Sequence, residues 1–290
     1  MIYTFGGVHG TQSQFADKIA EFAVWALMTE VCIGPKPGLV DRTNSGAHAD
    51  MDLFTFINSA SALFPYFRTV TAHSLTYDGD LRALLSCLAP IGIQAEQDML
   101  LATGGVNTHK GAIFSLGVLC AAAASVAKQE EKGAEPDLAE ACASIAGGRV
   151  RECAAQRDGV TKGEQVYIQH GISGILGEAV AGFPHMFEVA LPIFRKQMER
   201  GSSVEEAGVA ALLHLIAAVD DTNIIARCGI EVLRDTQTRV GKEIAEYRNV
   251  SQYMQFARAL DKAFIQRNIS PGGCADLLAA TCFVYRLFYG

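Results

Sequence analysis

Apolar residues recur every three to four positions along most of this chain, which is the spacing of a helix that buries one face. Near the N-terminus, Phe15, Ile19, Phe22 and Ala26 form such a stripe. The same spacing predicts further helices over residues 53–64, 81–99, 111–128, 136–147, 174–182, 186–199, 204–219, 222–234, 252–266 and 271–288. Pro90 is expected to kink or restart the helix in which it lies. No run shows the period-two alternation of a half-buried strand, and no repeat of fixed period is present.

The pattern therefore predicts an all-α fold in one domain, residues 1–290, with roughly ten helices around a single core. Residues 129–136 are charged and contain Gly and Pro, which is typical of an exposed turn. Residues 147–163 mix glycines with basic residues, as a mobile basic connection would; these are Arg149, Arg151, Arg157 and Lys162. The alternative to one domain is a boundary between residues 130 and 165.

Composition mainly excludes classes of function. The net charge of -7 and the pI near 5.5 argue against general binding to nucleic acid or to anionic membranes. An anionic small substrate stays compatible with these values, because an acidic protein can carry a local cationic pocket. The eight cysteines are scattered without a CxxC pair, which favours reduced, buried thiols of a cytoplasmic protein over a zinc site.

The chain shows no targeting or membrane signal. Its N-terminus lacks a basic region followed by an apolar stretch, so we expect no secretory leader. The longest uncharged segment, Gly111 to Ala127, is rich in Gly, Ala and Ser. It falls near the lower end of the ~17–25 residues that span a bilayer, and a buried helix is the better interpretation.

The richest local signal is Asn107-Thr108-His109-Lys110-Gly111, which directly precedes a predicted helix. The first turn of a helix has backbone N–H groups without intrahelical partners and carries the positive end of the helix dipole. With a lysine added, this segment predicts a cradle for phosphate. For His109 the alternatives are a ligand-binding group and an ordinary polar residue at a helix start.

A second polar segment is the long connection over residues 34–50, where two prolines and two nearby glycines prevent a helix. Connections longer than ~12–15 residues are uncommon in compact domains and often carry function. The alternative is a solvated loop that merely caps the helix after it. Its candidate polar residues are Lys36, Asp41, Arg42, Asn44, His48 and Asp50.

The third segment, residues 270–276, begins with a Ser-Pro helix start and continues with Gly272 and Gly273. The two glycines leave first-turn amides open to a phosphate oxygen, and Asp276 follows about one turn later. The alternative is a tightly packed helix start without a ligand.

Acidic residues elsewhere predict a cation site. Asp220 and Asp221 interrupt two apolar helices, and adjacent carboxylates there are suited to Mg²⁺ whose shell is completed by water and substrate phosphates. The alternative is an N-cap at the helix starting at Thr222, which needs only one of them. Glu96 lies among apolar residues and is a third candidate, or else part of a solvated face.

Five of these segments, taken in order, resemble the motifs of the triphosphoribosyl-dephospho-CoA synthase family. The resemblance extends from residue 36 to the last predicted helix, and five motifs in order are specific where one alone would be weak. They are Lys36-Pro-Gly-Leu-Val-Asp-Arg42, Asn44-Ser-Gly-Ala-His48 with Asp50-Met51, Gly105-Val-Asn-Thr-His-Lys-Gly111, Asp221-Thr-Asn223, and Ser270-Pro-Gly-Gly273 with Ala275-Asp-Leu-Leu278.

The resemblance implies an all-helical fold and a reaction that joins ATP to 3'-dephospho-CoA with release of adenine. It implies Mg²⁺ bound with ATP. It also implies a product that serves the acyl carrier protein of citrate lyase or malonate decarboxylase, so that the carrier protein is only an indirect partner. Two positions depart from the expected pattern: Leu176 stands where an arginine is expected, and Cys274 replaces a small polar residue. Leu176 puts one phosphate contact in doubt.

The implied chemistry assigns the candidate residues. An oxocarbenium-like transition state calls for a nearby carboxylate, and the attacking hydroxyl needs a base. The catalytic candidates are Asp41, Asp276 and His109; the substrate-binding candidates are Lys36, Arg42, Asn44, His48, Asn107, Thr108, Lys110, Ser270, Gly272 and Gly273; and the Mg²⁺ candidates are Glu96, Asp220 and Asp221. Two alternatives stay open: a nucleotide-binding scaffold or regulatory protein, and a related transferase or phosphate-ester hydrolase.

Overall fold

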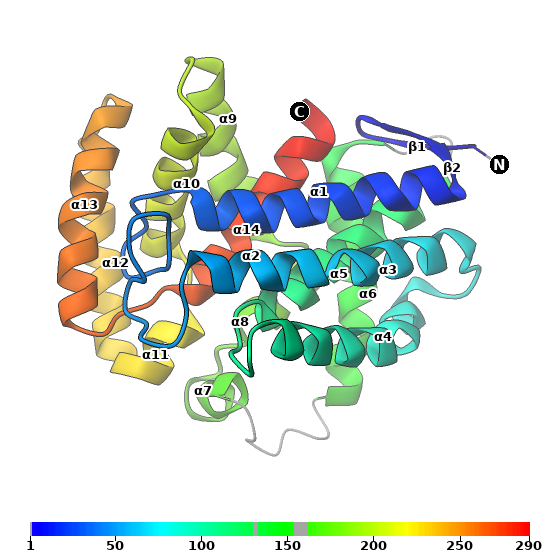
Figure 1. The fold of residues 1–290 in the computed structure, drawn as a ribbon, viewed down its shortest axis with the longest axis horizontal. Coiled ribbons are helices and arrows are strands. Elements are labelled where there is room, and N and C mark those ends of the chain that lie inside the picture. Colours follow the sequence, from blue (N-terminus) through cyan, green and yellow to red (C-terminus); the bar gives the residue numbers. More distant parts are fainter. Residues whose placement is uncertain (1, 130–132, 154–161) are drawn as a thin grey trace.

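The computed structural model describes residues 2–129, 133–153 and 162–290, and over them the fold is all-α apart from one hairpin (Figure 1). The strands are β1 (Ile2–Phe5) and β2 (Val8–Thr11). The helices are α1 (Gln12–Cys32), α2 (Leu53–Ala62), α3 (Phe64–Thr76), α4 (Leu81–Ala102), α5 (Lys110–Val126), α6 (Glu135–Cys153), α7 (Lys162–His170), α8 (Gly174–Val180), the π-helix η1 (His185–Ala190), α9 (Leu191–Glu199), α10 (Val204–Ala218), α11 (Thr222–Cys228), α12 (Ile230–Ile244), α13 (Val250–Gln266) and α14 (Gly272–Tyr289).

Helix α5 forms the centre of the core. From Ala112 to Val126 all of its residues except Phe114 are buried, and it packs against α3, α6 and α14. Its Gly, Ala and Ser side chains are small, so the neighbouring helices can approach closely. This confirms the prediction of a buried helix.

Among the described residues, no single helix has the length and apolarity of a membrane span; the bent pair α10–α11 meets that test only jointly.

Around this centre, α1 packs against α2, α3 and α14, while α10 packs against α9, α12 and α13 (Figure 1). Buried apolar residues from β1 to α14 form one contiguous cluster. The seven cysteines with described side chains are free thiols; Cys32 and Cys87 are exposed, and four others are buried as predicted.

The prediction that the chain contains no β-strands was wrong at the N-terminus. β1 and β2 pair antiparallel, with Ile2 opposite Thr11. Tyr3, Phe5 and Val8 are buried, but strands of four residues are too short to show a period-two pattern in the sequence. The turn at Gly6 has a positive φ of 57°, and the amide of Gly7 donates to the carbonyl of Leu287, which ties the hairpin to α14.

Helix boundaries also differ from the prediction, which counted roughly ten helices. Helix α4 continues through Pro90 without a restart. The proline removes only one intrahelical hydrogen bond, and the 22-residue helix retains its packing against α2 and α6. The predicted helix 222–234 divides at Gly229, whose φ of 91° ends α11. Helices α3 and α7 were not predicted, and α6 continues to Cys153. The remainder of the predicted basic connection, 154–161, and residues 130–132 of the predicted turn lie outside the described residues.

Candidate functional site

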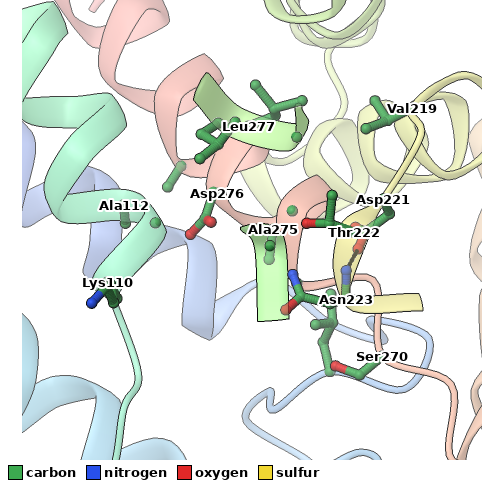
Figure 2. Close-up of a pocket in the computed structure, with 18 of the residues that line it drawn as sticks. Lys110, Ala112, Val219, Asp221, Thr222, Asn223, Ser270, Ala275, Asp276 and Leu277 are labelled. Carbon is green, nitrogen blue, oxygen red and sulfur yellow. Dashed lines mark hydrogen bonds between the residues drawn. The ribbon is translucent and has the colours of Figure 1, made fainter. Parts of the chain in front are cut away.

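A cavity of about 1120 Å³ lies where the three predicted polar segments meet (Figure 2). The predicted convergence of residues 36–50, 105–111 and 270–276 on one cleft is therefore confirmed. The predicted site residues that line it are Lys36, His48, Asn107, Thr108, His109, Lys110, Asp220, Asp221, Ser270, Gly272, Gly273 and Asp276. Four predicted site residues are absent from this lining: Asp41, Arg42, Asn44 and Glu96.

The start of α5 faces the cavity. The Asn107 side chain accepts a hydrogen bond from the backbone amide of Lys110 at 3.2 Å, so it caps the helix. In the part of the chain that the structure describes, the amides of Gly111 and Ala112 have no protein partner. The Lys110 ammonium, on a half-exposed side chain, lies 2.8 Å from Glu96. Glu96 is thus the partner of this lysine.

His109 precedes α5 and is 3 % exposed. The Thr108 hydroxyl donates to Ser59 Oγ at 2.8 Å, and Ser59 Oγ lies 2.7 Å from His109 Nδ1, within hydrogen-bond distance. The other ring nitrogen, Nε2, is buried and has no partner within the described residues. Burial, and next the charge of Lys36, lowers the pKa of His109 to about 3. A neutral imidazole with one unpartnered ring nitrogen is therefore available beside the cavity.

Asp276 lies against the first turn of α5. A Cβ atom on Gly111 would stand 2.0 Å from Asp276 Oδ2, so only glycine allows this approach. Figure 2 shows the carboxyl group between the start of α5 and Ala275. No described residue forms an ion pair or hydrogen bond with it. Burial, and next the charges of Glu30 and Asp221, raises the pKa of Asp276 well above its usual range.

Asp221 joins two helices. Its Oδ1 accepts from the amides of Asn223 and Ile224 at 2.8 and 3.2 Å, which caps α11, as the alternative interpretation of this residue predicts. Its Oδ2 accepts from the amide of Cys274 at 2.9 Å. One amide of the predicted cradle at α14 is therefore already bonded to a carboxylate, and those of Gly272 and Gly273 remain, within the described chain, without a protein partner.

Asp220 points to a different helix. Arg234 of α12 donates to both of its carboxylate oxygens, at 2.5 and 3.3 Å, and Gln237 donates to one of them. These bonds outweigh the effect of burial and leave the pKa of Asp220 below its usual value.

The three carboxylates predicted to hold Mg²⁺ thus have separate partners: Arg234 for Asp220, backbone amides for Asp221, and Lys110 for Glu96. Among the described side chains, no group of three His, Cys, Asp or Glu is arranged to hold a metal ion. The residues present do not fit a metal centre built by the protein alone.

Much of the connection between α1 and α2 is held by its own polar residues. Asp41, 2 % exposed, accepts from the amides of Lys36, Thr43 and Asn44 at 2.9, 2.6 and 3.1 Å. The Asn44 side chain donates to Asp261 of α13, and Arg42 forms an ion pair with Glu205 at 2.5 Å. The structure therefore gives these three predicted site residues contacts that shape and anchor the loop.

Lys36 is a special case, because it lines the cavity but is 1 % exposed. Its ammonium forms an ion pair with Glu30 of α1 and donates to the Glu30 carbonyl at 2.8 Å. Burial still raises the pKa of Glu30, although Lys36 opposes this. The pair fixes the start of the loop onto α1.

His48 and Ser270 bring the loop against the start of α14. His48 Nε2 lies 2.9 Å from Ser270 Oγ, and Arg227 donates to His48 Nδ1 at 3.3 Å. Because arginine only donates, the ring proton is on Nε2 and the Ser270 hydroxyl is free to donate to a ligand. Arg227 also lines the cavity, and sequence reasoning missed it, although it follows the Asp221-Thr-Asn223 motif by one helical turn.

Comparison with known proteins bears on this site. Residues 16–290 match the CitG family, described as ATP:dephospho-CoA triphosphoribosyl transferase. The chain belongs to this family. A probable 2-(5''-triphosphoribosyl)-3'-dephosphocoenzyme-A synthase of Vibrio cholerae serotype O1 (strain M66-2) is 40 % identical over 93 % of this chain and 88 % of its own length.

Two further relatives carry the name 2-(5''-triphosphoribosyl)-3'-dephosphocoenzyme-A synthase. The one from Pectobacterium atrosepticum is 40 % identical over 90 % of this chain and 86 % of its own, and the one from Klebsiella pneumoniae is 37 % identical over 93 % and 90 %. No solved structure matches the chain.

Two positions had departed from the pattern expected of the family. Cys274 is buried, and its amide binds Asp221, so a thiol is accommodated where a small polar residue was expected. Leu176 does not line the large cavity; it lines a neighbouring one of about 360 Å³. Position 176 of this family member therefore lines the smaller cavity, and it carries no arginine that could contact phosphate.

Sequence reasoning also missed a His–carboxylate pair in the cavity wall. His185 Nδ1 lies 2.5 Å from Glu178 Oε1, and both residues line the cavity. Glu178 follows Leu176, a position that departs from the family pattern, by two residues, but nothing in the sequence places His185 beside it.

Proposed function

We propose that this family member transfers the triphosphoribosyl group of ATP to 3'-dephospho-CoA and releases adenine, with the cavity as the site of reaction. The observation that carries the proposal is the Asp276 carboxyl group, which has no described protein partner and lies at the start of α5 in a cavity of about 1120 Å³. The family described for residues 16–290 supplies the reaction.

The start of α5 is the better of the two predicted phosphate cradles. Its Gly111 and Ala112 amides are open, Lys110 supplies a charge, and the neutral His109 ring beside them has an unpartnered Nε2. At α14, by contrast, the Asp221 carboxylate already bonds the Cys274 amide and would repel a phosphate. The triphosphate therefore belongs at α5, and the Ser270 hydroxyl is a donor for another part of a substrate.

Asp276 fits the chemistry at the anomeric carbon. When adenine leaves, electron density develops on the base, and a proton donor stabilises the departing group. A carboxyl group whose pKa is raised holds its proton to higher pH than an ordinary carboxyl group does and can donate it, as in glycoside cleavage. A neutral Asp276 also avoids repelling the triphosphate beside Gly111. Asp41 has no comparable access, since its bonds are within its own loop.

Magnesium is proposed to arrive with ATP. Mg²⁺ usually binds through one or two carboxylates together with substrate phosphates rather than in a cage built by the protein. The separate partners of Glu96, Asp220 and Asp221 agree with this. The product would reach an acyl carrier protein only in a later step.

The test is to mix the protein with ATP, Mg²⁺ and dephospho-CoA and to measure free adenine by chromatography. We expect adenine release that needs both substrates, with all three phosphates retained on the product, and that falls when Mg²⁺ is chelated. Formation of ADP or inorganic phosphate instead would indicate a phosphotransferase or hydrolase. Binding of ATP without any turnover would indicate the scaffold alternative.

Lys110 provides a prediction for the phosphate cradle. Charge-assisted hydrogen bonds contribute ~1.5–3 kcal/mol, so Lys110→Ala should weaken ATP binding roughly ten- to a hundredfold. Lys110→Arg should restore it only in part, because the guanidinium is a wider, planar group. Calorimetric titration with ATP measures both variants.

The matched control is Glu96→Gln, which removes the partner of Lys110 without removing the lysine. This variant should bind ATP at least as tightly as the wild type. Equal affinities for the wild type and Lys110→Ala would exclude this lysine as a triphosphate ligand.

A further inference from the structure

The pair formed by Glu178 and His185 is a built feature of the cavity wall. Both oxygens of the Glu178 carboxylate contact His185: Oε1 lies 2.5 Å from the ring Nδ1, and Oε2 accepts from the backbone amide at 3.3 Å. The Glu178 side chain is 12 % exposed and that of His185 is 32 % exposed. The carboxylate is therefore fixed, and the imidazole retains access to the cavity that it lines.

The backbone between the two residues is unusual. Gly182 and Phe183 both have positive φ, 80° and 59°, and a non-glycine residue in this region is strained. Phe183 is fully buried, and its amide donates to the Glu178 carbonyl at 2.7 Å, which holds the turn. Directly afterwards the chain enters the π-helix η1, whose first residue is His185. Such helices are frequent at functional sites.

The hydrogen bonds define the state of the ring. A carboxylate only accepts, so Nδ1 carries a proton and donates it to Glu178. Nε2 is then the nitrogen left for a ligand, and no described residue forms a hydrogen bond with it. In the neutral ring this nitrogen carries a lone pair. A carboxylate that fixes one ring nitrogen while the other acts on a substrate hydroxyl is the arrangement of a general base.

Charges around the ring act in the same direction. The bond to Glu178 raises the pKa of His185 above its usual value, burial opposes this, and the charges of Glu178, Asp220 and Glu188 add to the rise. A raised pKa makes the neutral ring a stronger base.

The pair lines the same cavity as Asp276. Burial raises the pKa of the Cys274 thiol, and the charges of Asp221, Asp276 and Glu178 raise it further. The charges of these three carboxyl groups thus reach the thiol at the start of α14. Asp276 belongs to α14 itself and lies against Gly111 of α5, and Glu178 comes from α8.

We infer that His185 is the general base that activates the attacking ribose hydroxyl of dephospho-CoA, and that Glu178 is the residue that positions it. The inference rests on the proposed function. It gives the two protons of the reaction to separate groups on the cavity wall, His185 for the attacking hydroxyl and Asp276 for the leaving adenine.

The step balances as follows in atoms and electrons. The hydroxyl oxygen forms a bond to the anomeric carbon of ATP while its proton passes to His185 Nε2. The bond from that carbon to adenine breaks, its electron pair stays on adenine, and adenine takes a proton from Asp276. His185 then returns its proton to water and Asp276 regains one, so that no oxidant or further reactant is needed.

The test compares His185→Gln and Glu178→Gln with the wild type in the adenine-release assay, at saturating substrates and across pH. For His185→Gln we expect kcat to fall by about 10²–10⁴ while calorimetric affinity for ATP is unchanged. For Glu178→Gln we expect a smaller loss, with the ascending limb of the pH profile moved to lower pH, because the charge that raises the pKa of His185 is gone. His73→Gln, at an exposed position outside the cavity, is the matched control.

The outcomes separate the two proposals. If the wild type releases no adenine, the proposed function is wrong. If the wild type is active and His185→Gln retains its kcat, only the inference about His185 is overturned. A purely structural role would lower ATP affinity and thermal stability in both variants and leave the ascending limb of Glu178→Gln where it was, which would also overturn it.

Discussion

Asp276→Asn should lower the rate of adenine release by about 10²–10⁴, the usual contribution of a positioned proton donor. Asparagine has a similar size and cannot donate a proton as an acid, so the approach to Gly111 is retained while the chemistry is lost. ATP affinity should change little, since a neutral Asp276 carries no charge that the variant removes. The measurement is single-turnover adenine release beside calorimetric ATP titration, and Asp235→Asn, an exposed site outside the cavity, is the control.

Asp276→Asn should also change how the stability of the protein depends on pH. Because the folded-state pKa of Asp276 is raised, the unfolded chain loses this proton at lower pH than the folded protein does. The carboxyl group therefore destabilises the fold progressively as pH rises from its unfolded pKa towards its folded pKa. Asp276→Asn removes this loss, so its melting temperature should rise relative to the wild type as pH increases over that window. A difference that is independent of pH would contradict the raised pKa.

Lys36→Met should destabilise the protein by about 3–5 kcal/mol, because it leaves the Glu30 carboxylate buried without its cation. The folded-state pKa of Glu30 is raised even with the lysine present and should rise further without it. The penalty should therefore be smallest at low pH, where Glu30 takes up a proton, and should grow as pH increases. Urea unfolding at several pH values measures this.

Two variants make the result specific to the buried pair. Adding Glu30→Gln to Lys36→Met should recover much of the loss, since no buried charge then remains. Lys18→Met breaks the exposed pair with Glu21 and should cost only about 0–1 kcal/mol. Lys36 was predicted to bind phosphate, and the double variant tests that as well. A large loss of ATP affinity in a stable double variant would show that the lysine contacts ATP despite its bond to Glu30.

The sequence predicted the helices whose burial leaves a regular pattern of apolar residues. The apolar stripe of α1 and the uncharged run of α5 were recognisable because burial on a helix leaves a period in the sequence. The hairpin at Ile2–Thr11 was missed because four residues leave too short a pattern. The division at Gly229 was missed because an isolated glycine does not reveal whether its φ is positive.

The candidate site was predictable in place but not in detail. Gly111 and the Ser270-Pro start mark helix N-termini locally, and tertiary packing brings them to one cavity. Sequence cannot tell which partner a polar side chain meets. Asp41 and Lys36 looked like catalytic and phosphate-binding groups, yet they bond their own loop and Glu30. His185 was missed for the same reason, since its contact with Glu178 depends on two left-handed residues between them.

The burial of α5 determines how the site responds to salt. A protein with a net charge of -7 repels polyanionic substrates at long range, and mobile ions weaken that repulsion. The attraction at the start of α5 is screened less, because the helix behind it is enclosed by protein. Added salt should therefore speed the approach of ATP and should weaken the bound state chiefly through the half-exposed Lys110, leaving the contribution of the helix start.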